Sequence, residues 1–263
     1  MSENILKTIT EKTRERIAEE ERRVPLGELK AEIKDKACPP DFLSALKRPG
    51  MAYICEVKKA SPSKGLIAPD FPYLDIAMEY EAAGAAAVSC LTEPCWFLGS
   101  DRYVREITGK INIPVLRKDF TVNEYMIYQA RCLGASAVLL ICAVLEKGQL
   151  KEYLALAKEL GMNALVEAHD EDEVAAALSA GADIIGVNNR DLRTFTVDTS
   201  NSVRLRSLAP ADKVFVSESG IKTKEDIKKL YDNGVNAVLI GETLMRSPDR
   251  KAALEELNGG PLA

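Results

Sequence analysis

The sequence after residue 50 alternates eight times between a short apolar run and a longer, helix-like stretch. The apolar runs, which we expect to be strands, are Ala52–Val57, Ala86–Leu91, Pro114–Arg117, Ser136–Ile141, Ala164–Glu167, Asp183–Val187, Lys213–Val216 and Asn236–Ile240. Continuous apolar runs separated by helices are typical of a parallel sheet that helices cover. Eight such units in about 210 residues predict an α/β fold, the (β/α)8 barrel. An open doubly wound sheet is the alternative, although no GxGxxG follows the first run.

The helix-like stretches between these runs are Tyr73–Ala83, Glu124–Leu133, Glu146–Leu160, Glu171–Ala180 and Lys224–Asn233. A glycine follows several of them, which favours a left-handed residue just beyond the helix.

The first 50 residues do not follow this alternation. Of the first 23 residues, 12 are charged, and four residues recur every four positions: Ile5, Ile9, Thr13 and Ile17. This spacing predicts a helix with a narrow apolar stripe. We therefore expect an N-terminal helical extension over 1–50 and a TIM barrel domain over 51–263. The stripe must be buried somewhere: over the barrel mouth it would form a lid, and against the side or bottom it would add only stability.

Composition and charge exclude several classes of protein. Lys plus Arg number 35 and Asp plus Glu number 40, a net charge of −5, whereas nucleic-acid binders usually carry a basic excess. The longest apolar run, Ala137–Leu145, is far shorter than the roughly 20 residues of a membrane-spanning helix. No apolar core of a secretory signal is visible. The six cysteines form no CxxC pair, so we expect buried, reduced thiols in a cytoplasmic protein without nucleic-acid or membrane partners.

Charged or amide side chains follow six of the predicted strands, at the barrel face where function resides. They include Glu56 and Lys58, which are two residues apart and therefore share a strand face, and Lys118, Glu167, Asn188 and Glu218. Charges inside a barrel mouth are costly unless they are paired or functional. His169 is the only histidine, and the sequence has no carboxylate–histidine cluster spaced for a transition metal, so we expect a structural or solvent-facing role and no metal site.

Glycines after the last two predicted strands suggest a phosphate site. Ser219-Gly220 follows one, and Gly241 follows the other at the start of a helix-like stretch. Loops at these positions form the common phosphate site of barrels, where glycine lets the backbone approach an anion. A side chain at Gly241 is expected to obstruct that anion; plain turn glycines are the alternative. Without a P-loop, the chemistry falls to Lys and Glu, as general acids and bases or through a lysine Schiff base.

Six motifs resemble those of the indole-3-glycerol phosphate synthase family. They are Glu56–Gly65 (EVKKASPSKG), Leu116–Phe120 (LRKDF), Leu165–Glu167 (LVE), Gly186–Leu192 (GVNNRDL), Val216–Ile221 (VSESGI) and Ile240–Met245 (IGETLM). The charged N-terminal segment also resembles that family's extension. Cys95–Ser100 (CWFLGS) departs from the family, which more often has two aromatic residues and a polar or Gly residue before Gly-Ser.

The resemblance implies a reaction and a set of roles. The substrate would be 1-(2-carboxyphenylamino)-1-deoxyribulose 5-phosphate, and ring closure would release CO2 and water without a cofactor. Lys118 matches the general acid, Glu167 the carboxylate that assists proton transfer at the anilino side, and Glu56 a second acid or base that orients the lysine.

The matched binding positions fall into three groups. The substrate carboxylate and amine would be held by Lys58, Asn188 and Arg190, and a substrate hydroxyl would contact Glu218. The phosphate or carboxylate shell would comprise Ser61, Ser219, Gly220, Gly241 and the backbone of Glu242. The resemblance also makes other enzymes of tryptophan biosynthesis candidate partners.

Two rival functions remain compatible with these residues. One is a different phosphate-handling barrel enzyme that uses Lys58 or Lys118 as a Schiff-base nucleophile, which borohydride would trap. The other is a non-catalytic protein that binds a phosphorylated metabolite, which would not need Glu and Lys on four strands.

Overall fold

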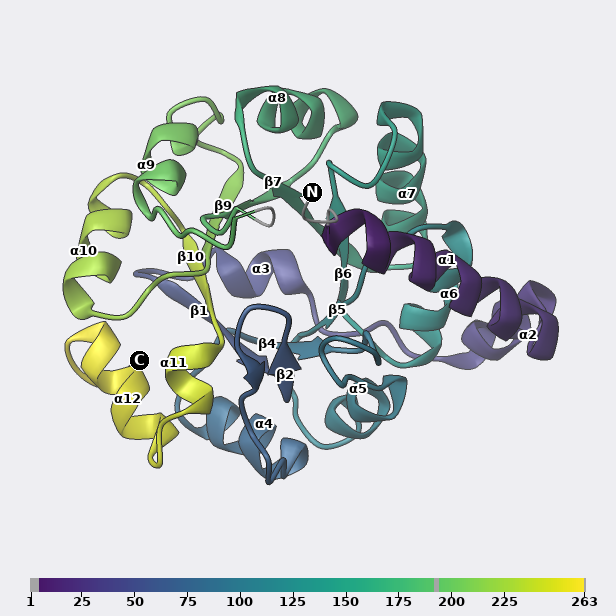
Figure 1. Cartoon of the computed structure of the whole chain (residues 1–263), viewed down its shortest axis with the longest axis horizontal. Helices are drawn as coiled ribbons and strands as arrows, with labels where there is room; N and C mark the ends of the chain where they lie inside the picture. Colours follow the sequence, from purple (N-terminus) through teal and green to yellow (C-terminus); the bar gives the residue numbers. More distant parts are fainter. Residues whose placement is uncertain (1–4, 192–193, 263) are drawn as a thin grey trace.

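Eight parallel strands close into a barrel in the computed structural model, which describes residues 5–191 and 194–262. Around the barrel the strands are β1 (Ala52–Val57), β4 (Ala87–Leu91), β5 (Val115–Lys118), β6 (Ala137–Ile141), β7 (Asn163–Ala168), β8 (Ile184–Asn188), β9 (Val214–Glu218) and β10 (Ala237–Ile240). Because β1 pairs with both β4 and β10, the sheet has no free edge (Figure 1). The predicted TIM barrel is confirmed, and the open sheet is excluded.

Helices surround the barrel and connect its strands (Figure 1). They are α4 (Tyr73–Ala82), α5 (Asp101–Thr108), α6 (Glu124–Cys132), α7 (Lys147–Glu159), α8 (Glu171–Ala180), α9 (Ser200–Arg206), α10 (Lys224–Asp232), α11 (Glu242–Met245) and α12 (Arg250–Asn258). The five helices predicted from the sequence end within one residue of the predicted limits. Asn123, Asp170 and Thr223 begin three of them, each accepting a hydrogen bond from a first-turn N–H group.

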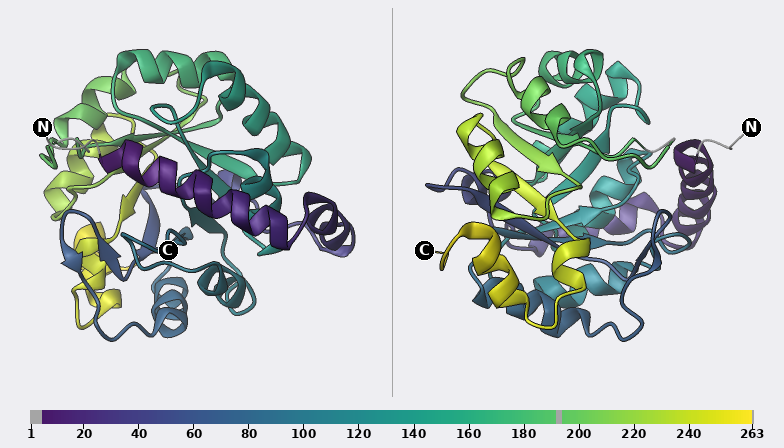
Figure 2. Two further views of the ribbon diagram at one scale, coloured as in Figure 1. Left: turned by 45° about the vertical axis from the view of Figure 1, so that its right-hand side comes forward. Right: turned by 60° about the vertical axis from the view of Figure 1, so that its left-hand side comes forward.

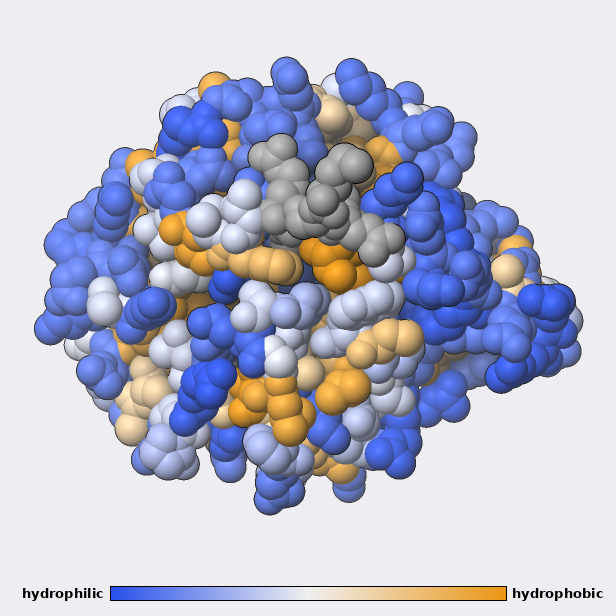
Figure 3. All heavy atoms as spheres, viewed as in Figure 1, coloured by the Kyte–Doolittle hydropathy of each residue, from blue (hydrophilic) through white to orange (hydrophobic). Residues whose placement is uncertain are grey.

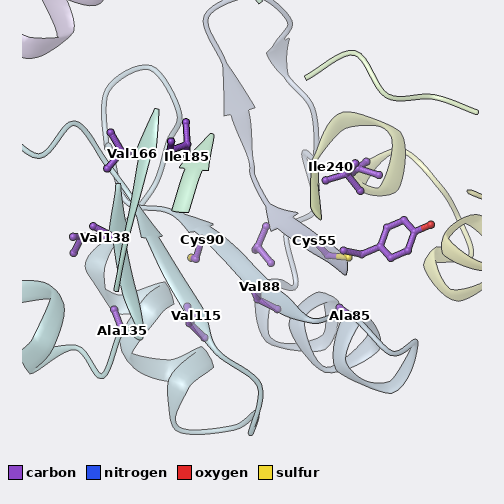
Figure 4. Close-up of a cluster of buried hydrophobic side chains, with 14 of the residues drawn as sticks. Cys55, Ala85, Val88, Cys90, Val115, Ala135, Val138, Val166, Ile185 and Ile240 are labelled. Atoms are coloured by element: carbon purple, nitrogen blue, oxygen red, sulfur yellow. The ribbon is translucent and has the colours of Figure 1, made fainter. Parts of the chain in front are cut away.

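Strand side chains are buried on both faces, which explains the continuous apolar runs. Figure 4 shows one cluster of buried side chains, which includes Cys55, Val88, Val115, Val166 and Ile185. A second cluster is formed by the alternate strand residues, among them Ile54, Leu116, Leu139, Leu165 and Leu239. No helix in residues 5–191 or 194–262 is long and apolar enough to cross a membrane.

The cysteines are only partly as expected. Cys55, Cys90 and Cys132 are buried, and Cys142 is half-buried. Cys38 and Cys95 are exposed, because each lies in a loop beside a proline rather than inside an apolar element. The expectation of burial was therefore wrong for these two thiols. All six are free thiols.

The N-terminal extension contacts both ends of the barrel. Its elements are α1 (Ile5–Arg23), α2 (Leu26–Glu32), η1 (Ile33–Asp35) and α3 (Phe42–Leu46). The helix α1 runs across the face where the strands end (Figure 2). Its Ile9 packs into the same cluster as Phe120 and Leu139, whereas its Ile17 packs with Tyr125 of α6.

The helix α3 covers the opposite end of the barrel, where the strands begin. Phe42 and Leu46 are fully buried among the first residues of the strands. The N–H of Leu43 donates a hydrogen bond to the side chain of Asn163, the first residue of β7. The last part of the extension therefore belongs to the barrel core.

Candidate active site

A cavity of about 910 Å³ opens at the carboxyl ends of the strands. All twelve site residues expected from the sequence line it: Glu56, Lys58, Ser61, Lys118, Glu167, Asn188, Arg190, Glu218, Ser219, Gly220, Gly241 and Glu242. On this face, hydrophobic side chains gather near the middle, and hydrophilic ones cover α1 and α2 (Figure 3). Leu192, the last residue of one motif, lies outside the described residues.

Lys118 lies between two buried carboxylates at the floor of the cavity. It is the last residue of β5, and its Nζ is 3.5 Å from Oε2 of Glu167 on β7 and 3.5 Å from Oε2 of Glu218 on β9. Asn188, at the end of β8, donates a hydrogen bond of 3.4 Å to Oε1 of Glu167. The parallel register brings these groups together, because each stands at or next to the end of its strand.

Burial and neighbouring charge oppose each other in this cluster. Burial alone would lower the pKa of Lys118, but Glu218, Glu167 and Glu56 together raise it above its usual value. Burial raises the pKa of Glu218 to about 7, with Glu167 and Glu56 adding to the effect and Lys118 opposing it. The pKa of Glu167 is lowered, because Lys118 and His169 outweigh its burial. One lysinium therefore faces one firmly ionised carboxylate and one that titrates near neutrality.

Glu56 and Lys58 form a second charged pair on β1 and the residue after it. The Lys58 ammonium contacts Oε1 of Glu56, and the side chain of Glu56 is almost fully buried. A Cβ at Gly241 would overlap this carboxylate oxygen and lie 3.0 Å from Nζ of Lys58. The missing side chain at Gly241 therefore makes room for the Glu56–Lys58 pair, and the expectation that a side chain there would obstruct an anion stays a prediction.

The loop after β9 has an unusual backbone. Ser219 has a φ of 69°, which is uncommon for a residue with a side chain, and Gly220 has a φ of 84°. A Cβ at Gly220 would overlap Val197 and lie 3.0 Å from Cγ2 of Thr199. Glycine is thus needed where this loop meets the loop after β8.

Basic side chains that the sequence reasoning missed surround the same end of the cavity. They are Lys64, Lys222 and Arg246. Glu242 is 3.4 Å from Lys64 and 3.2 Å from Arg246, so its negative charge is paired at the cavity rim. Lys64 lies in the turn between two short strands, β2 (Ala60–Ser61) and β3 (Gly65–Leu66), which the sequence did not predict. Strands of two residues are too short to show the alternation of apolar and polar residues by which a strand is predicted.

An apolar wall stands opposite these basic groups. Phe97 and Phe120 contribute rings 6.1 Å apart, and the wall also includes Leu139, Ile141 and, from α1, Ile5, Leu6 and Ile9. Buried Glu93 shapes the loop that carries Phe97, because its carboxylate accepts the N–H groups of Cys95, Trp96 and Phe97. The cavity therefore suits a molecule with an apolar ring and an anionic end.

A buried ion pair ties α1 to the residue beside Lys118. Arg16 Nη2 donates to both carboxylate oxygens of Asp119, at 3.1 Å and 2.9 Å. Asp119 also accepts hydrogen bonds from the hydroxyl of Thr92 and the N–H of Phe120. A contact between residues 103 positions apart carries no local sequence signal, so sequence reasoning could not find it.

His169 is half-buried rather than solvent-facing, whereas the structural role that the sequence analysis also allowed is not contradicted. Its side chain is only 21% exposed, and its Nε2 is 3.6 Å from Oε1 of Glu167. A signal was present: His169 stands two residues after Glu167, the spacing that indicated a shared face for Glu56 and Lys58.

Comparisons with known proteins agree with the motifs. A family model described as "Indole-3-glycerol phosphate synthase" matches residues 6–257. A curated protein of that name from Ruminiclostridium cellulolyticum is 53% identical over 257 residues, covering 97% of this chain and 99% of the relative. Another from Endomicrobium trichonymphae is 62% identical over 216 residues, covering 82% and 84%.

Solved structures with little sequence similarity share the fold. The 3-hexulose-6-phosphate synthase of Salmonella typhimurium aligns with a TM-score of 0.65 at 14% identity, covering 80% of this chain and 97% of that one. The thiamine phosphate pyrophosphorylase of Pyrococcus furiosus aligns with a TM-score of 0.59 at 15% identity, covering 83% and 96%. These two similarities concern the barrel alone. The family match and the two curated relatives span most of the sequence, and the chain therefore belongs to the indole-3-glycerol phosphate synthase family.

Proposed function

We propose that this chain catalyses the reaction of its family, with the cavity residues in the roles given below. The substrate is 1-(2-carboxyphenylamino)-1-deoxyribulose 5-phosphate, and the products are indole-3-glycerol phosphate, CO2 and water. The observation that carries the proposal is Lys118, a lysinium held 3.5 Å from two buried carboxylates on the floor of a cavity with one apolar wall.

The substrate's three parts match three regions of the cavity. The aromatic ring packs against Phe97 and Phe120, and the carboxylate lies near Lys58 and Arg190. The phosphate binds around Ser61, Ser219, Gly220, Gly241 and the N–H of Glu242, which are flanked by Lys64, Lys222 and Arg246. Lys58 borders this region too, because its Nζ lies 3.0 Å from where a Cβ on Gly241 would stand.

Lys118 acts as the general acid in ring closure. Attack of the carboxylate-bearing ring carbon on the ketone builds negative charge on the ketone oxygen, and a lysinium supplies both charge and proton there. Loss of CO2 then restores the aromatic ring. Lys118, reprotonated from solvent, gives a second proton to the hydroxyl group, which leaves as water, and Glu167 takes the proton lost from the CH2 next to the anilino nitrogen. Glu218 binds a substrate hydroxyl, and Asn188 orients Glu167. Glu56 holds Lys58 toward the substrate.

Two observations weigh against the rival functions. A Schiff base needs a neutral amine, whereas the surrounding carboxylates raise the pKa of Lys118 despite its burial. A binding protein has no need for Lys118 enclosed by acids from separate strands, since burying such charges is costly. A cytoplasmic location is also proposed, because the six cysteines are free thiols. Other enzymes of tryptophan biosynthesis stay proposed partners.

Fluorescence tests the function in one experiment. An indole product emits differently from an anthranilate-type substrate, so adding the substrate to purified protein should produce the indole signal together with one CO2 per turnover. Borohydride added during turnover should trap no lysine adduct. Binding of substrate without an indole signal would favour the non-catalytic rival, and a trapped adduct would favour the Schiff-base enzyme.

A further inference from the structure

The imidazole of His169 stands behind Glu167, on the side away from Lys118. Oε1 of Glu167 faces Nε2 of His169 at 3.6 Å and the amide of Asn188 at 3.4 Å, whereas Oε2 faces Lys118 at 3.5 Å. The His169 Nε2 atom is shielded from solvent and makes no hydrogen bond within the described residues. It lies within ion-pair distance of one group, the carboxylate of Glu167.

The rest of the ring is held from α8 and α9. Nδ1 of His169 is 3.1 Å from Oε2 of Glu173, and the same oxygen accepts the His169 peptide N–H at 2.8 Å. The amide of Asn201 donates to the His169 carbonyl at 3.1 Å. These contacts fix both the backbone and the ring, so the direction of Nε2 is set before substrate arrives.

This geometry selects the protonated ring. An ionised Glu173 requires a proton on Nδ1, and a neutral ring would then point its Nε2 lone pair at the Glu167 carboxylate. A second proton on Nε2 turns that repulsion into attraction. Burial favours the neutral ring, but Glu173, Glu167 and Glu218 outweigh it and raise the pKa of His169 to about 9.

We propose that His169 is a positioning residue: as an imidazolium between Glu173 and Glu167, it keeps Glu167 ionised and oriented for proton transfer. This rests on the function proposed above. Lys118 alone is a poor counter-ion for Glu167, because it is shared with Glu218 at the same distance. The second cation lets Glu167 remain a base while Lys118 remains free to give its proton to the substrate.

The pH dependence of kcat/KM tests the role through His169→Gln. An opposite charge within about 4–6 Å moves a carboxyl pKa by roughly 1–3 units, so its loss should raise the pKa of Glu167. The acid limb of the profile should therefore move to higher pH by about one unit, and kcat/KM at a fixed pH on that limb should fall about tenfold. Substrate affinity should change little, because His169 does not line the cavity.

A second variant tests Glu173, which contacts the His169 ring on the side away from Glu167. Glu173→Gln keeps an acceptor for the peptide N–H but removes the charge that favours the imidazolium, so the ring should lose its proton at lower pH. The imidazole titration should move to lower pH, and the acid limb should stay, because the ring is still protonated at the pH of that limb. Asp172→Asn, an exposed change on the same helix, is the matched control and should move neither the imidazole titration nor the acid limb.

Proton NMR gives a readout that does not depend on activity. Because the sequence holds one histidine, its imidazole resonances are unambiguous in untagged protein. They should titrate well above 6.5 in the wild type and at lower pH in Glu173→Gln. Titration at or below 6.5, or a folded His169→Gln with an unchanged acid limb, would overturn the proposal. If His169→Gln does not fold, an unmoved imidazole titration in Glu173→Gln overturns it. A wild type that forms no indole would instead refute the proposed function.

Discussion

Lys118 is surrounded by acidic groups that come from distant parts of the chain, and this shapes what each of them can do. Glu167 and Glu218 share its ammonium at equal distance, and Glu56 adds to the field. The shared cation stabilises only one full negative charge well, so burial leaves Glu218 with a raised pKa near 7. Near neutral pH the cluster therefore holds its protons unevenly, which is what a reaction that both gives and takes protons requires.

Replacing Lys118 by alanine tests this cluster directly. Lys118→Ala should lower kcat by about 10²–10⁴-fold, the usual contribution of a general acid, with a smaller change in KM. Steady-state kinetics with the fluorescent product is the measurement. Lys110→Ala, at an exposed lysine beyond α5, is the control and should behave as the wild type. A Lys118→Ala enzyme with unchanged kcat would rule out the general-acid role.

The sequence located the charged residues of the cavity but not the groups that hold them. Strand ends in a barrel meet at one face, so the amino-acid order alone placed Lys118, Glu167 and Glu218 together. The partners of Asp119 and Glu242 could not be placed in this way, because Arg16 and Lys64 reach them from remote segments. The contact between His169 and Glu167 was not predicted, because the lone histidine was compared with metal clusters rather than with its neighbour Glu167.

At the level of elements, regular length decided what could be predicted. Strands and the longer helices show the apolar pattern over enough residues to set their limits within one or two residues. The helix α9 and the β2–β3 pair are short and polar, so they show none. The helix α1 was predicted from its apolar stripe. The stripe did not predict that Ile9 faces the cavity while Ile17 faces α6, because both are isoleucines at equivalent positions of the helix.

The docking of α1 can be tested without removing it. Deleting residues 1–45 would also remove Phe42, which is buried at the other end of the barrel. Arg16→Met instead removes the bonds to Asp119 together with a 3.7 Å ion pair to Glu20 on the same helix, and it should cost about 1–3 kcal/mol, as charged hydrogen bonds do. If α1 is a lid, kcat/KM should also fall several-fold, because water would reach the cavity.

Lys12→Met is the matched control for this prediction. Lys12 lies on the same helix, and its ammonium pairs with exposed Glu15. Melting temperature and kcat/KM should both stay at wild-type values in this variant. Equal activity of Arg16→Met and Lys12→Met, with only the melting temperature lowered in the first, would leave α1 a purely stabilising element.

Across the whole molecule, the cavity rim is basic where Lys64, Lys222 and Arg246 lie and apolar on the other side. Binding of a small anion can test this difference. Inorganic phosphate should compete with substrate and should raise the melting temperature, since a ligand that binds the native state stabilises it. Lys222→Ala should weaken this inhibition about fivefold, equivalent to roughly 1 kcal/mol. Lys228→Ala, at an exposed lysine on α10, should not. Non-competitive phosphate, or equal inhibition of both variants, would contradict the site.

The barrel is closed by its first and last strands, so the order in which the chain is synthesised determines when the site can form. Glu56 on β1 lies in the room left by Gly241, directly after β10. At roughly 5–20 residues per second, a ribosome makes these two residues about 10–40 s apart. Until then β1 has no partner on one side, and an unpaired strand invites association with other chains. The last strand thus completes the proposed catalytic centre in the same step in which it pairs the open edge of β1.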